Sequence, residues 1–380
     1  MKGKTIIIGA GVAGLTIASK LQNEDYIILE ARERIGGRVF TNDKNIDDGA
    51  AWVHGLCDNP LTNLLLSDDL IPVAECNPWM HSENANITYY LGERSSPKAQ
   101  PDGCITPPYN TSLRSEVEEK KCSMGLKGND KFPFDKFPLL ADKWNELLQK
   151  TSDFSGSIAD AFSFLSADDD MRNFLYMIEV WCGGSIHNLP ASFLQQAECK
   201  NALFGDYAGS HCLFKKGART LIDSLSSTCI GKIICNQIVT RVVYKPNNVD
   251  VHTREGLVYN CNKLCITVPP GPLKDIEFEP PLPPKKMESL SRIKMGSYKK
   301  IQLEFDEVFW NDVPMILTRN EENEYILWNN YMVSKNMPIL EAICPADNGF
   351  RLSHKSDEEI VDSVLDHLKL YFKNVPFPKS

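Results

Sequence analysis

The chain lacks the sequence features that mark several common functional classes. Its 12 cysteines include no Cys-x-x-Cys pair and its seven histidines include no His-Glu-x-x-His motif, so the sequence predicts no metal site. No apolar run approaches the roughly 18 residues of a membrane-spanning helix, and no signal peptide precedes the first predicted strand. We therefore expect a protein that is not secreted and has no membrane partner, located in the cytoplasm or also in the nucleus.

An excess of positive charge is also missing. The sequence has 41 Lys and Arg residues against 50 Asp and Glu residues, a formal net charge of −9. Because nucleic-acid binding needs a basic surface, this balance disfavours a nucleic-acid partner. It is compatible with a cationic substrate but does not identify one. The length of 380 residues predicts roughly two or three domains.

The most informative feature that is present is a glycine-rich turn near the N-terminus. The turn is Gly9-Ala-Gly11-Val-Ala-Gly14, and it lies between a predicted buried strand, Ile6 to Ile8, and a predicted helix, Leu15 to Leu21. In such a turn the first glycine permits the tight bend, the second lets the backbone approach a pyrophosphate, and the third lets helix and strand pack closely. The helix N-terminus would then bind the phosphates through its free N–H groups.

A second phosphate-binding signal follows directly. The predicted strand Tyr26 to Leu29 ends at Glu30, about 20 residues after the first glycine, where a carboxylate that binds ribose hydroxyls is expected. Gly36 and Gly37 allow another close backbone approach, and Arg38 can donate a fork of hydrogen bonds to a phosphate. These residues predict a bound dinucleotide, although the first motif alone does not separate NAD from FAD.

The run LEARERIGGR, residues 29–38, resembles the flavin-containing amine oxidase family, which includes monoamine oxidases, polyamine oxidases and lysine-specific histone demethylases. The resemblance implies FAD as the cofactor. It implies that the first motif holds the diphosphate, that Glu30 holds the adenosine ribose, and that Gly36 to Arg38 runs along the flavin side. Ala31 and Arg32 match family positions that also contact the cofactor, whereas for Arg34 we expect a solvated surface position.

Residues 48–55, DGAAWVHG, resemble the family segment that lines the flavin ring. The Trp-Val-His-Gly form is closest to animal polyamine oxidases. By this resemblance His54 would contact the substrate or its leaving amine, and the alternative is a hydrogen-bonded loop histidine. The implied cofactor positions in this segment are Gly49, Ala50, Ala51 and Trp52.

Two later segments carry the resemblance further. Val239 resembles the family valine whose backbone contacts the adenine, with an ordinary strand valine as the alternative. Residues 295–310 resemble the segment that bears a lysine beside the flavin N5 atom, and in this register the lysine is Lys300. The alternative is a solvated lysine on an amphipathic strand, where neighbouring Lys299 alternates to the opposite face.

The resemblance implies an α/β fold with two interleaved domains. A Rossmann-like FAD-binding domain of the glutathione-reductase type would comprise residues 1–76 and 208–278, and an α+β substrate domain residues 77–207 and 279–380. The sequence shows no match to the third FAD-binding segment of the family. A split, truncated or non-catalytic homologue is therefore the alternative to an active enzyme.

Local patterns predict several secondary-structure elements of the substrate domain and of the FAD-binding domain. Residues 84–138 lack any sustained period and are expected to be irregular. We expect helices at 139–150 and from Asp169 to Gly183, and a capping box at Ser356 that opens a helix through Phe372. The expected strands are the hairpin 249–259 and, later, Ile301 to Phe305, Tyr325 to Trp328 and Ile339 to Ile343.

The activity implied by the resemblance is the FAD-dependent oxidation of an amine, with a polyamine favoured. The amine becomes an imine and then an aldehyde, and O₂ is reduced to hydrogen peroxide. The flavin performs the redox chemistry while the protein orients and tunes it, so no protein nucleophile is needed. Lys300 would hold a water molecule near flavin N5. The partners implied are a small amine and O₂, and the sequence identifies neither the amine nor the oligomeric state.

Overall fold

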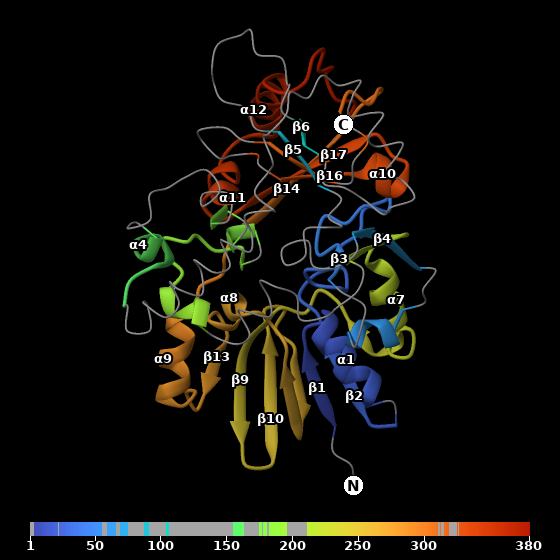
Figure 1. Ribbon diagram of the computed structural model, residues 1–380. Coiled ribbons are helices and arrows are strands. Elements are labelled where there is room, and N and C mark those ends of the chain that lie inside the picture. The colour runs from blue at the N-terminus through green and yellow to red at the C-terminus, as the bar shows by residue number, and fades with distance from the viewer. Residues whose placement is uncertain are drawn as a thin grey trace. The chain divides into compact units, whose positions relative to one another are not determined.

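The computed structural model in Figure 1 divides by its internal contacts into two compact units. Unit 1 comprises Met1–Val53, Pro60–Leu70 and Leu213–Met295, and unit 2 comprises His54–Asn59, Ile71–Cys212 and Gly296–Ser380. The residues that the structure describes are 4–21, 23–54, 59–65, 69–74, 87–90, 104–105, 155–162, 175–176, 178–180, 182–195, 211–310, 312, 315–318, 325 and 327–380.

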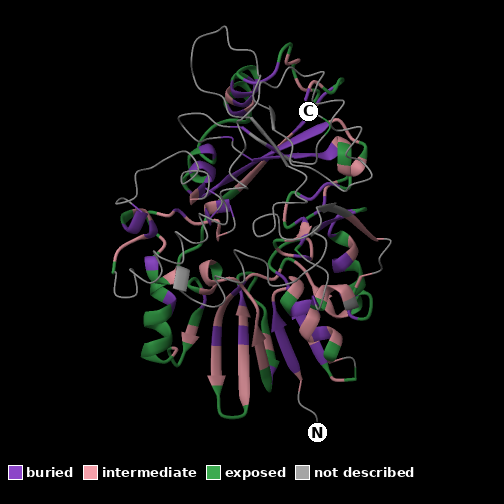
Figure 2. Ribbon diagram, viewed as in Figure 1, coloured by how far each residue is buried: buried purple, intermediate pink, exposed green. Residues whose placement is uncertain are grey.

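Unit 1 contains a four-stranded parallel sheet in the order β12-β1-β2-β8. Helix α1 (Val12–Lys20) connects β1 (Thr5–Ile8) to β2 (Tyr26–Leu29), as the apolar runs predicted. Strands β8 (Ile233–Ile234) and β12 (Lys263–Ile266) complete the sheet. Continuous apolar runs are typical of parallel strands that are covered on both faces, and β1 is buried along its whole length (Figure 2).

A second sheet of unit 1 has the order β11-β10-β9-β13. Strands β10 (Asn248–Thr253) and β11 (Val258–Cys261) form the predicted antiparallel hairpin. Strand β9 (Val239–Lys245) pairs with β10, and β13 (Glu277–Glu279) adds to β9 in parallel. A buried apolar cluster joins this sheet to the parallel one through Ile6, Ile8, Leu29, Val239, Val242 and Val251.

Helix α1 lies against the other face of the parallel sheet. Side chains alternate along a strand, so the buried Ile7 points away from the cluster of Ile6 and Ile8 and toward α1. Helix α7 (Arg219–Ser226) packs against α1. The shorter elements are β3 (Trp52–Val53), α8 (Pro270–Leu273), α9 (Pro284–Arg292) and the 3₁₀ turns η1 (Pro60–Asn63) and η6 (Ile230–Lys232).

Unit 1 extends further along the chain than the domain boundary predicted at residue 278. Residues 279–295 stay with it because the Tyr244 hydroxyl donates to the carbonyl oxygen of Pro281 at 3.3 Å and the Lys274 ammonium donates to that of Ile293 at 2.6 Å. The changes after Leu70 and Cys212 fall about six residues from the predicted positions 76 and 207, and His54–Asn59 is an additional short segment of unit 2. Which ligand each unit binds stays a prediction at this point.

Unit 2 is built on a six-stranded sheet that contains the three strands predicted near residues 301–305, 325–328 and 339–343. Two further strands lie within residues 84–138, where we had expected irregular chain. They form because β5 (Ile87–Tyr90) pairs in parallel with β15 (Met315–Leu317), a partner far away in the sequence, and β6 (Cys104–Ile105) pairs with β5. In sheet order the strands are β14 (Tyr298–Glu304), β17 (Ile339–Pro345), β16 (Leu327–Asn330), β15 (Met315–Leu317), β5 (Ile87–Tyr90) and β6 (Cys104–Ile105).

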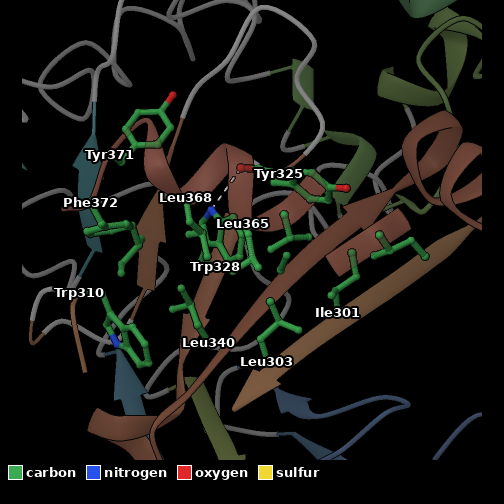
Figure 3. Packing of buried hydrophobic residues seen from close by; sticks show 14 of the residues in the cluster. Ile301, Leu303, Trp310, Tyr325, Trp328, Leu340, Leu365, Leu368, Tyr371 and Phe372 are labelled. Atoms are coloured by element: carbon green, nitrogen blue, oxygen red, sulfur yellow. Dashed lines mark hydrogen bonds between the residues drawn. The ribbon is translucent and has the colours of Figure 1, made fainter. Parts of the chain in front are cut away.

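Helix α12 (Asp357–Lys369) covers one face of this sheet. The predicted capping box is confirmed, because Ser356 and Glu359 each accept a hydrogen bond from the other's backbone N–H. The helix ends three residues before the predicted Phe372. Figure 3 shows the packing of its apolar residues, among them Leu365 and Leu368, against Ile301, Leu303, Trp328 and Leu340 of the strands.

The remaining described elements of unit 2 are short. The helix predicted to end near Gly183 is helical at 175–176, 178–180 and 182, and Gly183 has a positive φ of 62°. The helix predicted at 139–150 lies outside the described residues. Strands β4 and β7 each cross a unit boundary. The bounds are β4 (Leu70–Ala74), α4 (Ile158–Phe162), η5 (Ala191–Gln195), β7 (His211–Phe214), α10 (Tyr331–Lys335) and α11 (Ala346–Leu352). Among the residues described, no helix is long and apolar enough to cross a membrane.

A buried histidine lies within the core of unit 2. The Thr318 hydroxyl donates to the carbonyl oxygen of Tyr325 at 2.5 Å, so it can only accept from Trp328 Nε1 at 2.8 Å and from His367 Nε2 at 2.7 Å. The imidazole therefore carries its proton on Nε2. Its Nδ1 has no hydrogen-bond partner among the described residues, and burial lowers the pKa of His367 to about 3.

We expect this histidine to make the stability of the protein sensitive to acid. The pKa of His367 is about 3 in the folded state and about 6.5 in the unfolded chain. Between pH 3 and pH 6.5 the unfolded chain therefore carries a proton on this residue that the folded protein does not. Stability should be unaffected above about pH 6.5 and should fall as pH drops toward 3, by at most about 1.4 kcal/mol per pH unit from this group. His367→Phe should flatten that slope in urea unfolding measured across the window. The exposed His354→Gln is the control, and an equal slope in parent and His367→Phe would contradict the assignment.

Candidate functional site

Two glycines of the first turn are required by the local backbone. Gly9 has a φ of +103°, a region that other residues rarely adopt, and its N–H donates to the carbonyl oxygen of Leu29 at 2.8 Å. A Cβ atom on Gly14 would lie 1.9 Å from the carbonyl oxygen of Gly9. The Thr267 hydroxyl donates to the carbonyl oxygen of Ile8 at 2.8 Å and closes the turn from β12. Sequence reasoning gave Thr267 no role.

Gly11 differs because the fold does not require a glycine there. It is the N-cap of α1, with φ −79° and ψ −179°, and a Cβ atom would meet only the Cα of Gly37, at 3.9 Å. Gly36 lies beside it, bridged in parallel to Gly11, and its N–H donates to the carbonyl oxygen of Ala10 at 2.9 Å. The structure thus brings the two predicted glycine segments together at the helix N-terminus. The open side of Gly11 is the space that a pyrophosphate needs.

Glu30 lies at the end of β2 with only 7% of its surface exposed. Its Oε2 accepts from the N–H of Ala10 at 2.8 Å and its Oε1 from the N–H of Arg32 at 2.9 Å. A carboxylate oxygen can accept more than one hydrogen bond, so both oxygens can still accept from ribose hydroxyls. The N–H of Gln237 donates to the carbonyl oxygen of Glu30 at 2.8 Å, which brings the segment that begins β9 at the buried Val239 close to this site.

The residues from Ala31 to Arg38 differ in exposure. Ala31, Arg32 and Arg38 are exposed and can reach a ligand. Arg34, expected at a solvated surface position, is half-buried, and its guanidinium lies 4.3 Å from the centroid of the exposed Phe40 ring. Burial, with the nearby charge of Arg32, lowers the pKa of Arg34.

The segment predicted to line the flavin ring folds back on Arg38. The N–H of Ala50 donates to the carbonyl oxygen of Arg38 at 3.1 Å, and a Cβ atom on Gly49 would lie 2.1 Å from that same oxygen. Ala51 is buried and Trp52 is half-buried in β3. The glycine at position 49 thus lets residues 38–50 close into a compact loop.

A buried aspartate that sequence reasoning missed anchors this loop. Asp47 Oδ1 accepts from the Thr41 hydroxyl at 2.5 Å and from the N–H of Ala218 at 2.7 Å, at the start of α7. The N–H of Arg219 donates to the Thr41 hydroxyl oxygen at 2.9 Å. The only signal in the sequence was the position of Asp47 directly before the resembling segment, because its partners lie far away along the chain.

Within unit 2 the structure places Lys300 on β14 with only 10% of its side chain exposed. Its ammonium lies 3.7 Å from Oε2 of Glu341, which is fully buried. The same carboxylate accepts from Gln302 at 2.7 Å, from Asn329 at 2.8 Å and from the Tyr331 hydroxyl at 3.4 Å. Lys300 is therefore not a solvated lysine. No sequence signal pointed to Glu341 or to its three neutral partners.

The polar cluster lies on the face of the sheet opposite the apolar core. Ile301 and Leu303 point toward α12 (Figure 3), so Lys300 and Gln302 point the other way. Lys299 lies on the same face of the sheet as the apolar core, and its ammonium donates to the carbonyl oxygen of Leu352 at 3.2 Å. His54 is exposed, and its contact with a substrate stays a prediction.

The parallel sheet, the glycine turn at its helix and the buried acid on the next strand define a dinucleotide-binding protein. Comparison with known proteins gives the family. The sequence model of the flavin containing amine oxidoreductase family matches residues 12–380. The chain therefore belongs to this family. The predicted cofactor, FAD, and the predicted α/β fold are thereby confirmed.

Individual relatives agree with this membership. The chain is 27% identical to probable polyamine oxidase 4 of Arabidopsis thaliana over 98% of its own length and 72% of the relative's. It is 30% identical to human lysine-specific histone demethylase 2 over 80% of the chain and 35% of that protein. The solved structure of cyclohexylamine oxidase from Brevibacterium oxydans has the same fold, with a TM-score of 0.73, 19% identity, and coverage of 100% of this chain and 84% of that one.

Glu30 provides a direct test of the FAD site. Glu30→Gln would replace one acceptor oxygen by an amide NH₂, which must then face the N–H of Ala10 or of Arg32. Because hydrogen bonds to charged groups contribute about 1.5–3 kcal/mol, we expect FAD to bind roughly 10- to 100-fold more weakly, with some loss of stability as well. Titration of the apoprotein with FAD measures this. Glu33→Gln, at an exposed neighbouring carboxylate, should bind like the parent. Unchanged affinity in Glu30→Gln would remove the ribose role.

Proposed function

We propose that the protein is an FAD-dependent oxidase of amines, with polyamines as the favoured substrates, and that it reduces O₂ to hydrogen peroxide. The observation that carries this proposal is Lys300, which unit 2 holds almost buried beside a carboxylate on the face of the sheet opposite the core. Membership of the amine oxidoreductase family supports the reaction class. The preference for polyamines is supported by similarity to two plant polyamine oxidases, each 27% identical over at least 96% of the chain.

In the proposed reaction the amine loses two electrons and two protons and becomes an imine. Water hydrolyses the imine to an aldehyde and a smaller amine, and O₂ receives two electrons and two protons as hydrogen peroxide. FAD supplies the electron acceptor when bound. The glycine turn would hold its diphosphate, and Glu30 its ribose.

Lys300 would contribute by holding a water molecule through its ammonium hydrogens. Three N–H donors and no acceptor make an ammonium suited to fixing the oxygen of a water and leaving its hydrogens free. The substrate nitrogen must be neutral so that its lone pair can form the C=N bond as hydride equivalents leave the α-carbon. Proton transfer from the amine through such a water therefore favours the reaction. His54 would contact the substrate or the leaving amine.

The function can be tested with a peroxide-coupled assay on the FAD-loaded chain. The panel should contain spermine, spermidine, their acetylated forms, a simple monoamine and a methyl-lysine peptide. We expect turnover on the order of 1–10³ per second, with the highest kcat/KM for a polyamine. Higher kcat/KM for the monoamine or the peptide would change the substrate class. No peroxide with any amine, while FAD stays bound, would favour a non-catalytic flavoprotein of the same family.

A further inference from the structure

The carboxylate of Glu341 is the most deeply buried charge in the polar cluster of unit 2. None of its surface is exposed, and it lies on β17 between β14 and β16 (Figure 1). Gln302 and Asn329 are its directly opposite residues on these two strands. Directly opposite residues have neighbouring side chains, so the sheet register itself brings their amides to the carboxylate.

A buried carboxylate is unfavourable unless it is hydrogen-bonded and paired with a positive charge. Three neutral donors meet the first need, and the ammonium of Lys300, 3.7 Å away, meets the second. The pairing also acts in the other direction. A lysine has four rotatable carbon–carbon bonds and no preferred direction of its own, so a fixed anion decides where its ammonium lies.

We propose that Glu341 is a positioning residue for Lys300. Its rigidly held carboxylate fixes the place and the positive charge of the Lys300 ammonium, and through Lys300 it sets the rates of the redox steps. This inference rests on the proposed function, because Lys300 acts on those steps only if it lies beside the cofactor.

The surroundings of Glu341 allow its charge to be removed with little change in shape. The Oδ1 atom of Asn329 has no hydrogen-bond partner in the part of the chain that the structure describes. In Glu341→Gln the introduced carbonyl can keep accepting from Gln302 and Tyr331. The introduced NH₂ then faces Asn329, whose amide can turn over and accept through Oδ1. The variant should therefore fold and differ from the parent mainly in charge.

The first measurement is the chemical accessibility of Lys300 in the FAD-free chain. Reductive methylation followed by peptide mass spectrometry reports on each lysine separately. We expect Lys300 to react faster in Glu341→Gln than in the parent, while Lys299 on the same strand reacts equally in both. Faster reaction of both lysines would mean that the strand has loosened, and would overturn a specific positioning role, as would an unchanged rate at Lys300.

The second measurement is the rate at which O₂ reoxidises the flavin after photoreduction, which requires no amine substrate. We expect Glu341→Gln to slow this step by about tenfold or more, and Glu341→Asp, which keeps the charge, to be slowed less. A residue that acts through Lys300 should also have no further effect once Lys300 is gone. The double variant Lys300→Met/Glu341→Gln should therefore reoxidise no more slowly than Lys300→Met alone.

The outcomes separate this inference from the proposed function. Parent-like reoxidation in Glu341→Gln, or additive effects in the double variant, would overturn the positioning role even if amines are oxidised. If no amine in the panel reduces the flavin, the proposed substrate class fails, while the labelling and reoxidation results still decide the role of Glu341.

Discussion

Gly14→Ala should disrupt the folding of unit 1, whereas Gly11→Ala should leave the fold intact and abolish tight FAD binding. In Gly14→Ala the added methyl would lie 1.9 Å from the carbonyl oxygen of Gly9, which is backbone and cannot turn away. The strand or the helix must shift, at a cost of about 3 kcal/mol or more. Urea or thermal unfolding of the apoprotein should show this loss directly.

Gly11→Ala is the matched comparison from the same motif. Its backbone angles are accessible to any residue, and the methyl would meet only the Cα of Gly37 at 3.9 Å. We therefore expect its stability to lie within about 0.5 kcal/mol of the parent. FAD binding should nonetheless fall sharply, because the methyl occupies the side from which the pyrophosphate approaches. Equal stability of the two variants, or full flavin occupancy in Gly11→Ala, would contradict these separate roles.

Lys300→Met should slow flavin reduction or reoxidation by about 10²-fold or more while FAD stays bound, because the ammonium that holds the water is lost. The structure adds a second expectation. The fully buried Glu341 would lose its positive partner, so the variant should also lose about 3 kcal/mol of stability. Stopped-flow rates of the two half-reactions and unfolding curves measure the two effects separately.

Two controls separate rate from stability. Lys299→Met changes the neighbouring lysine, whose ammonium contacts the backbone of Leu352, and should leave both half-reactions at parental rates. Lys300→Met/Glu341→Gln removes the buried negative charge as well, so it should regain stability without regaining speed. Parental rates in Lys300→Met would return Lys300 to the role of a structural ion pair.

Elements with local signals could be predicted from the sequence, and elements that depend on distant partners could not. The β1–α1–β2 unit, the hairpin of β10 and β11, and the capping box at Ser356 each contain their own signal within a few residues. Strand β5 has no such signal. It pairs with β15, more than 200 residues later, and that pairing rather than its own pattern makes it a strand.

The same distinction applies to the candidate site. The glycines and Glu30 lie within one contiguous motif, so sequence spacing sufficed to predict that they lie close together. Asp47 holds Ala218, 171 positions away, and Glu341 meets Lys300 only through the register of β14 and β17. A single glutamate in an otherwise apolar run gives no indication of these partners. The motif predicted separate roles for its glycines, and the backbone geometry agrees: the fold requires Gly14, whereas Gly11 leaves room for a ligand.

The central claim is that this chain binds FAD at the glycine turn and Glu30 and that the bound flavin oxidises amines. The most direct test is to mix the FAD-loaded protein anaerobically with spermine or spermidine and to record the visible absorbance of the flavin. We expect the absorbance of oxidised flavin to disappear within a single turnover and to return, with release of hydrogen peroxide, when O₂ is admitted. An unchanged spectrum with every amine of the panel, in protein that demonstrably holds FAD, would contradict the claim.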